Sequence, residues 1–309
     1  MQLPELIEQA QSAERSGEWS RSLELYQRAL DEARQNADAA RTAELLRWIG
    51  RVHRLRGSID AAARSYNESL AVAEASGLTL HIASALNVIA MLEQAQGNVD
   101  AAETLYLRGR DLAIAIGDER LTAMIEQNFA TMANIRGETD VALASYGAAL
   151  ERYRRMKDDF LSAAALNNMG MAHTDRGEWP EAAARFHAAA DHATRCADTE
   201  ILGTIHLNTA ELHLKSGDLD RAREHCARAF AIFSRVEAKT SLAETYKLYA
   251  AIYRAAGKPE LANVHLSVIV DLARTCGDKL LEAEIEHERA LLHMAEGRSR
   301  EALLSLNAA

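Results

Sequence analysis

The chain has 309 residues, of which 48% are hydrophobic but only 5% are aromatic, and its formal net charge is −10. Nucleic-acid binding requires a basic face, so an acidic chain of this kind excludes a nucleic-acid partner. No apolar run reaches the ~18 residues of a membrane span, and the opening MQLPELIEQAQSAERSG lacks the basic and apolar regions of a secretory signal. We therefore expect no membrane partner.

The three cysteines are scattered along the chain. Cys196, Cys226 and Cys276 form no CxxC pair. An odd, scattered set is typical of reduced thiols in a cytoplasmic protein. The sequence therefore predicts a cytoplasmic location.

A glycine recurs every 40 residues along the whole chain, at Gly17, Gly57, Gly97, Gly137, Gly177, Gly217, Gly257 and Gly297. A fixed period of this length indicates that one supersecondary unit is repeated. In chain order the predicted repeats are 2–37, 38–77, 78–117, 118–157, 158–197, 198–237, 238–277 and 278–309, and the last is incomplete. Together they predict a single solenoid domain over residues 1–309.

Each repeat is predicted to hold two helices joined by tight turns. In the second helix a small residue is followed four positions later by a ring, as in Ala62/Tyr66, Ala102/Tyr106, Ala142/Tyr146 and Ala182/Phe186. This spacing places both residues on one helix face, and each glycine suits the left-handed position that ends the preceding helix. Aspartates predict the helix starts: Asp38, Asp118, Asp158, Asp198 and Asp278 for the first helices, and Asp60, Asp100, Asp140 and Asp220 for the second.

These columns resemble the tetratricopeptide repeat pattern W-x2-L-G-x2-Y…A-x3-F. The first-helix part is matched by Leu46-x2-Ile49-Gly50-x2-His53 and by Leu166-x2-Met169-Gly170-x2-His173. The resemblance covers the full chain, but the period is 40 residues and the terminal proline is absent. In this respect the chain is similar to the longer repeats of kinesin light chains, of animal spindle-orientation scaffolds and of bacterial peptide-sensing regulators. The resemblance implies an all-α fold, a right-handed solenoid superhelix of about eight helix-turn-helix repeats, whose first helices line a concave groove.

In the second repeat, arginines fill the groove register that the resemblance implies, which is ten, six and three residues before the glycine. Arg47, Arg51 and Arg54 follow an i, i+4, i+7 spacing and share one helix face, with Trp48 beside them. Guanidinium groups commonly hold carboxylates or phosphates. We therefore predict an anchor for an acidic end of a bound segment. The alternative is a solvated face whose charge is balanced by Glu44 and neighbouring acids.

In the third to fifth repeats, the same register carries amide side chains. They are Asn87, Gln94, Gln127, Asn134 and Asn167, and an adjacent column adds Asn128, Asn168 and Asn208. A carboxamide offers an acceptor and two donors, so a row of them can pair with the backbone of an extended peptide. Similar asparagine ladders occur in the kinesin-light-chain-like repeats. The alternative is that these amides hydrogen-bond between neighbouring helices.

The sequence contains no pattern for a metal site or a catalytic site. His53, His173, His213 and His293 share one column, four residues before their glycines, which favours a packing role. His287, Glu288 and His293 do not have the i, i+4 histidine spacing of H-E-x-x-H. There is no nucleophile elbow, P-loop or dinucleotide fingerprint. We therefore predict no enzymatic activity, no metal and no cofactor.

The last repeat stops at Ala309, before its second helix should end. Leu303, Leu304 and Leu306 then lie in a final helix with nothing stacked on them. Because a solenoid needs a polar cap for solubility, we expect either a chain that continues beyond Ala309 or self-association through this repeat.

The repeats are uniform in their packing columns and diverse in their groove columns. This contrast favours a non-catalytic scaffold that binds a protein or peptide segment. One alternative is a sensor module of a larger signalling or transcription-regulating protein. A second alternative is a self-assembling structural repeat protein.

Overall fold

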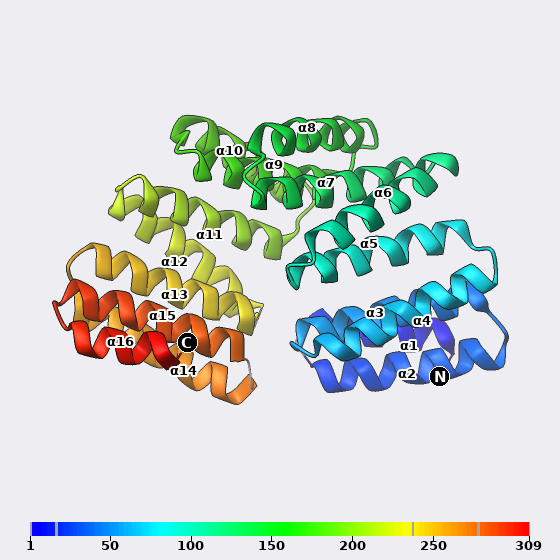
Figure 1. The fold of residues 1–309 in the computed structure, drawn as a ribbon, viewed down its shortest axis with the longest axis horizontal. Helices are drawn as coiled ribbons and strands as arrows, with labels where there is room; N and C mark the ends of the chain where they lie inside the picture. Colours follow the sequence, from blue (N-terminus) through cyan, green and yellow to red (C-terminus); the bar gives the residue numbers. More distant parts are fainter. Residues whose placement is uncertain (1, 16–17, 237, 277–278, 309) are drawn as a thin grey trace. The chain divides into compact units, whose positions relative to one another are not determined.

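The computed structural model describes residues 2–15, 18–236, 238–276 and 279–308; side chains are described for these except 15, 239–240, 271–276, 279–282 and 308. In this part of the chain every regular element is an α-helix (Figure 1), which confirms the predicted all-α fold. The sequence predictions for Gly17, Asp278 and the Cys276 side chain lie outside the described residues.

The chain forms two compact units, residues 1–161 and 162–309. The helices of unit 1 are α1 (Leu3–Arg15), α2 (Trp19–Gln35), α3 (Ala39–Leu55), α4 (Ile59–Ala75), α5 (Thr79–Ala95), α6 (Val99–Ala115), α7 (Glu119–Ile135) and α8 (Thr139–Arg155). The boundary between the units falls within α9 (Asp159–Asp175). The helices of unit 2 are α10 (Trp179–Arg195), α11 (Thr199–Lys215), α12 (Leu219–Arg235), α13 (Lys239–Ala255), α14 (Pro259–Cys276), α15 (Lys279–Ala295) and α16 (Ser299–Ala308).

Successive helices pair as the glycine period predicts. α3 packs beside α4 and α5 beside α6, each pair joined by a turn of a few residues (Figure 1). The glycine in the turn between the two helices of a pair adopts the left-handed conformation, with φ of 73° at Gly57 and 85° at Gly217. Because this conformation places Cβ against the following carbonyl oxygen in other residues, glycine ends these helices most easily. The predicted glycine role is confirmed at the described positions.

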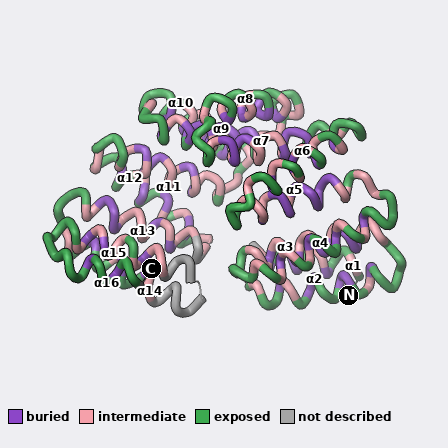
Figure 2. Tube along the Cα trace, in the orientation of Figure 1, coloured by how far each residue is buried: buried purple, intermediate pink, exposed green. Residues whose placement is uncertain are grey.

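The core lies along the facing sides of the paired helices, and the turns are exposed (Figure 2). The column of rings is buried throughout: Tyr26, Tyr66, Tyr106, Tyr146 and Phe186 are each no more than 2% exposed. A Cβ added at Gly170 would lie 2.6 Å from Cε1 of Phe186, so the glycine of the family pattern lets the ring approach its neighbouring helix. In the sixth repeat Cys226 replaces the ring, and burial raises the pKa of its thiol.

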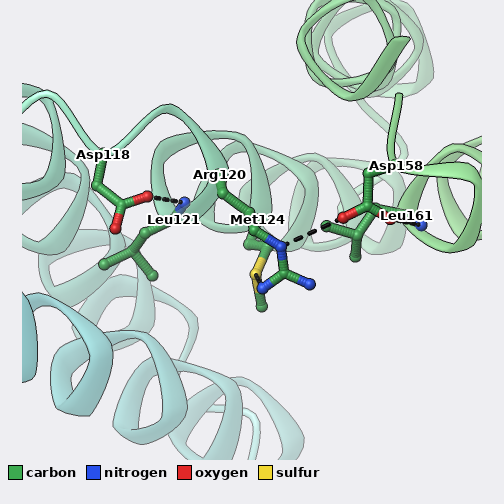
Figure 3. Close-up of polar contacts among 6 residues, drawn as sticks. All are labelled: Asp118, Arg120, Leu121, Met124, Asp158 and Leu161. Atoms are coloured by element: carbon green, nitrogen blue, oxygen red, sulfur yellow. Dashed lines mark hydrogen bonds and ion pairs between the residues drawn. The ribbon is translucent and has the colours of Figure 1, made fainter. Parts of the chain in front are cut away.

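The aspartates predicted to start the first helices do so. The carboxylates of Asp38, Asp118, Asp158 and Asp198 accept hydrogen bonds from the backbone N–H three residues later, at 2.8–3.0 Å. These bonds satisfy a donor that has no partner within the helix. Figure 3 shows Asp118 with Leu121, and also the 3.2 Å contact between Arg120 Nε and Asp158 Oδ2 that joins the starts of two successive repeats.

The predicted caps of the second helices were wrong by two residues. Ser58, Asn98 and Glu138 hold the cap position, without a side-chain cap bond, while Asp60, Asp100 and Asp140 lie inside the first turn. In α12 the cap is Asp218, which accepts from the backbone N–H of Arg221 at 3.1 Å, and not Asp220. The reason is that each second helix begins two residues after the glycine. The displaced carboxylates instead face the positive end of the helix dipole.

The final helix α16 leaves leucines exposed. Leu303, Leu304 and Leu306 are 61%, 64% and 45% exposed. Across the described residues, no helix combines the length and the apolar character needed to cross a bilayer.

Candidate functional site

The arginine face of α3, made of Arg47, Arg51 and Arg54, is partly engaged within the molecule. Arg51 reaches Glu14 of α1, with Nε 2.6 Å from Oε1 and Nη2 2.7 Å from Oε2. The Tyr26 hydroxyl donates to the same carboxylate at 2.9 Å. Burial alone would lower the pKa of Arg51, but the hydrogen bond and charge of Glu14 raise it. The charge of Arg51 is therefore compensated inside unit 1.

In the second and third repeats, the residue three positions before the glycine binds the tyrosine of its own repeat. Gln94 Oε1 accepts from the Tyr106 hydroxyl at 3.0 Å. Arg54 likewise hydrogen-bonds to Tyr66, whose pKa burial raises and Arg54 lowers. A buried hydroxyl needs such a partner. Two of the predicted site residues, Arg54 and Gln94, therefore hold a structural bond.

Arg47 differs from its two neighbours on this face. It is half-buried, and its Nε is buried without a hydrogen-bond partner among the described residues. Burial lowers the pKa of Arg47, Glu44 partly offsets this, and Arg51 lowers it further. Glu44 is itself paired with Arg41. Arg47 is thus a desolvated cation that has no ion pair within the described residues.

In unit 1 an amide pair joins α5 to α7, the two first helices that follow α3. Asn87 on α5 is 4% exposed, and its Oδ1 accepts from Asn128 Nδ2 of α7 at 2.9 Å. Gln127 beside Asn128 is half-buried, and its Oε1 is buried without a partner among the described residues. Arg47, Asn87 and Gln127 each stand ten residues before a repeat glycine. We call these three residues the polar row.

The amide pair of unit 2 has the same geometry. Asn208 on α11 donates from Nδ2 to Asn167 Oδ1 of α9 at 2.9 Å, and lies 3.4 Å from the Met171 sulfur. Asn167 is 7% exposed. Each pair therefore bridges neighbouring first helices, which is the alternative that the sequence left open for these amides. Each pair uses the acceptor of Asn87 or Asn167 and one donor of Asn128 or Asn208. Each amide therefore keeps further hydrogen-bonding capacity.

The remaining predicted site residues are Trp48, Asn134 and Asn168. Trp48 is half-buried and packs against the core of the first two repeats, with its ring 5.7 Å from that of Tyr26. Asn134 and Asn168 are half-buried.

Glu14 and Tyr26 are the residues that sequence reasoning missed. Glu14 stands three residues before Gly17, in the register used for the other repeats, so a signal was present. The role of Glu14 could not be predicted, because it depends on a contact with Arg51, 37 positions later in the chain. Among the described side chains, no group of three or more His, Cys, Asp or Glu residues is arranged to hold a metal ion.

Comparisons with known proteins support the repeat architecture. Models described as tetratricopeptide repeat match residues 7–79, 81–155, 162–191 and 201–275. No curated protein sequence shows significant similarity to the chain.

Three solved structures illustrate the likeness of fold. A Rap protein complexed with Competence and Sporulation Factor has a TM-score of 0.72 at 16% identity, covering 95% of this chain and 83% of that one. The Rap conjugation gene regulator of plasmid pLS20, in complex with the Phr* peptide, has 0.68 at 12% identity, covering 87% and 74%. BtubC (BKLC) from P. vanneervenii has 0.57 at 22% identity, covering 71% and 91%. At these identities the likeness is one of fold.

Proposed function

The chain belongs to the tetratricopeptide repeat family, and from this premise we propose that it is a non-catalytic module that binds an extended peptide segment of a partner protein. The binding site in unit 1 is the polar row, Arg47, Asn87 and Gln127. Repeat proteins of this kind work by presenting a surface along successive units.

The observation that supports this proposal most directly is the pair of unsatisfied groups at the two ends of the polar row. Arg47 Nε is a buried donor and Gln127 Oε1 is a buried acceptor, each without a partner among the described residues. Leaving such groups unpaired costs about 1–3 kcal/mol each. An extended peptide presents both carbonyl acceptors and N–H donors, so a single bound segment can satisfy both ends.

The chemistry at Arg47 favours an acidic group on the bound segment. A guanidinium with a pKa lowered by burial gains most from a carboxylate, because the pair restores the charge balance that burial removed. Packed helices lie roughly 8–10 Å apart, so the row from α3 to α7 spans about 20 Å. At about 3.3 Å per residue this corresponds to about six residues of peptide, with its acidic residue at the α3 end.

A regulatory role is the second candidate. The Rap conjugation gene regulator has this fold and was solved with the Phr* peptide. In that candidate the same polar row receives a peptide signal, and the bound state alters an output carried by another part of the protein or by a partner. The polar row and its chemistry are common to both candidates.

The test is a selection from a random octapeptide library displayed with free C-termini. Wild-type protein should enrich peptides with Asp or Glu, or the terminal carboxylate, at one fixed place. Arg47→Gln should lose that enrichment, while Arg56→Gln, which changes the exposed arginine directly after α3, should keep it. Enrichment of neutral or basic peptides, or of none, would contradict the proposal.

A further inference from the structure

A cavity of about 770 Å³ opens between α12, α13 and α14 in unit 2. Its wall is aromatic, formed by Phe230, Tyr246, Tyr249, Tyr253 and His265. Charged residues of α12 stand along it: Asp220, Arg221, Arg223 and Glu224. A volume in this range is typical of sites for small organic groups. We call the five rings the aromatic wall.

The rings of the aromatic wall are arranged around His265. Its imidazole is nearly parallel to Tyr253, at 5.3 Å and 7°, and to Tyr249, at 4.9 Å and 17°. Phe230 meets Tyr246 edge-on at 5.5 Å. All five rings are half-buried and line the cavity, so each keeps some exposed surface beside it. Exposed aromatic surface of this kind can receive another planar ring by offset or edge-to-face packing.

The charged residues beside the wall are paired on their own helix. Asp220 lies 3.2 Å from Arg223, and Glu224 lies 2.6 Å from Arg228. Asp218 lies 3.4 Å from Arg221. No excess charge of either sign faces the aromatic wall from α12. The ligand that complements it is therefore neutral.

One buried polar atom in the wall has no partner among the described residues. His265 Nδ1 is buried and makes no hydrogen bond with the described residues. Burial lowers the pKa of His265, so the ring is neutral near pH 7 and one of its nitrogens is an acceptor. A buried, unpaired nitrogen costs free energy, and a ligand with a hydrogen to donate would remove that cost.

In the sixth repeat, the nitrogen that corresponds to His265 Nδ1 has a hydrogen-bond partner. Forty positions before Tyr246, Tyr253 and His265 stand His206, His213 and His225. There, Nδ1 of His225 lies 3.2 Å from Nδ1 of His206, so one ring donates to the other. In the seventh repeat Tyr246 takes the place of His206, and that bond is lost.

We propose that the aromatic wall binds a planar aromatic group carrying one N–H or O–H, such as an indole or a phenol. The ring stacks among Tyr249, Tyr253 and Phe230, and its N–H or O–H donates to His265 Nδ1. This site lies on other helices than the polar row and does not depend on the peptide-binding proposal. The ligand is either a free small molecule or an aromatic side chain of a partner.

The test uses saturation-transfer NMR with the full chain. Indole and the capped tripeptide acetyl-Gly-Trp-Gly-amide are titrated separately, and binding of either supports the site and identifies the source. N-methylindole keeps the ring but cannot donate, so we expect it to bind about tenfold more weakly than indole. Tyr253→Leu should reduce indole binding at least fivefold.

His265→Phe is the decisive variant, because it keeps an aromatic ring and removes the acceptor. It should bind indole and N-methylindole equally. Val264→Ala, an exposed neighbour on α14, should behave as wild type. The proposal is overturned if indole and the tripeptide both fail to bind, if tetramethylammonium displaces indole more effectively than phenol does, or if His265→Phe still prefers indole.

Discussion

The arginine face of α3 in unit 1 and the aromatic wall of α12, α13 and α14 in unit 2 differ in how their side chains are stabilised. On the arginine face, two of the three guanidinium groups contact internal partners, Glu14 and Tyr66, and only Arg47 lacks one among the described residues. In the aromatic wall, the rings stabilise one another by stacking, and Nδ1 of His265 on α14 has no hydrogen-bond partner among the described residues. A charged face in a half-buried setting must be neutralised before it is stable, whereas an aromatic face has no such requirement. The unpaired atoms, and not the residue types, therefore distinguish Arg47 from the other two arginines of its face and His265 from the other rings of its wall.

The largest effect is expected from removing the internal partner of the arginine face. Glu14→Ala leaves Arg51 without its carboxylate and Tyr26 without its acceptor. We expect the free energy of unfolding to fall by about 2 kcal/mol, because a partly buried ion pair and the acceptor of the Tyr26 hydroxyl are lost together. Urea denaturation measures this. Glu18→Ala, which breaks an exposed pair with Arg21, should cost less than about 0.5 kcal/mol; similar losses in both variants would show that Glu14 has no special role.

A smaller effect is expected from acid at the histidines of the sixth repeat. Burial, followed by His206 and His213, lowers the pKa of His225 from 6.5 to about 4. The folded state therefore binds fewer protons than the unfolded one between these values. Stability is fully present above pH 6.5 and is lost as the pH falls toward about 4. Since His225 is half-exposed, we expect a loss of about 1–2 kcal/mol over this range.

The measurement is the midpoint of urea unfolding at successive pH values. His225→Phe should flatten the dependence, and His187→Ala, whose side chain is 83% exposed, should leave it unchanged. An unchanged slope in His225→Phe would contradict this account.

The repeat architecture was predictable because its signals are local. The 40-residue glycine period reports left-handed turns, and the aspartates before the first helices report caps, since both depend on neighbours within a few residues. The caps of the second helices were misplaced because Asp60 and Asp100 are equally suitable for a cap or for a first turn. Only the length of the turn distinguishes the two.

The sequence predicted which positions of the repeat carry the site residues, but not which other side chains those residues contact. Arg47, Arg51 and Arg54 are equivalent in the sequence, and their difference arises from contacts with Glu14 and Tyr66 on other helices. The aromatic wall was missed for a similar reason. Its rings come from three separate helices, and they meet only when α12, α13 and α14 pack together.

The central claim, that the polar row binds an acidic peptide, is tested most directly by the equilibrium affinity of a selected peptide for three proteins. We predict that Arg47→Gln weakens binding at least tenfold, the size of a lost charge-assisted hydrogen bond. Arg56→Gln should bind within twofold of wild type, although it removes the same charge. Equal affinities in all three proteins, or equal losses in both variants, would contradict the account.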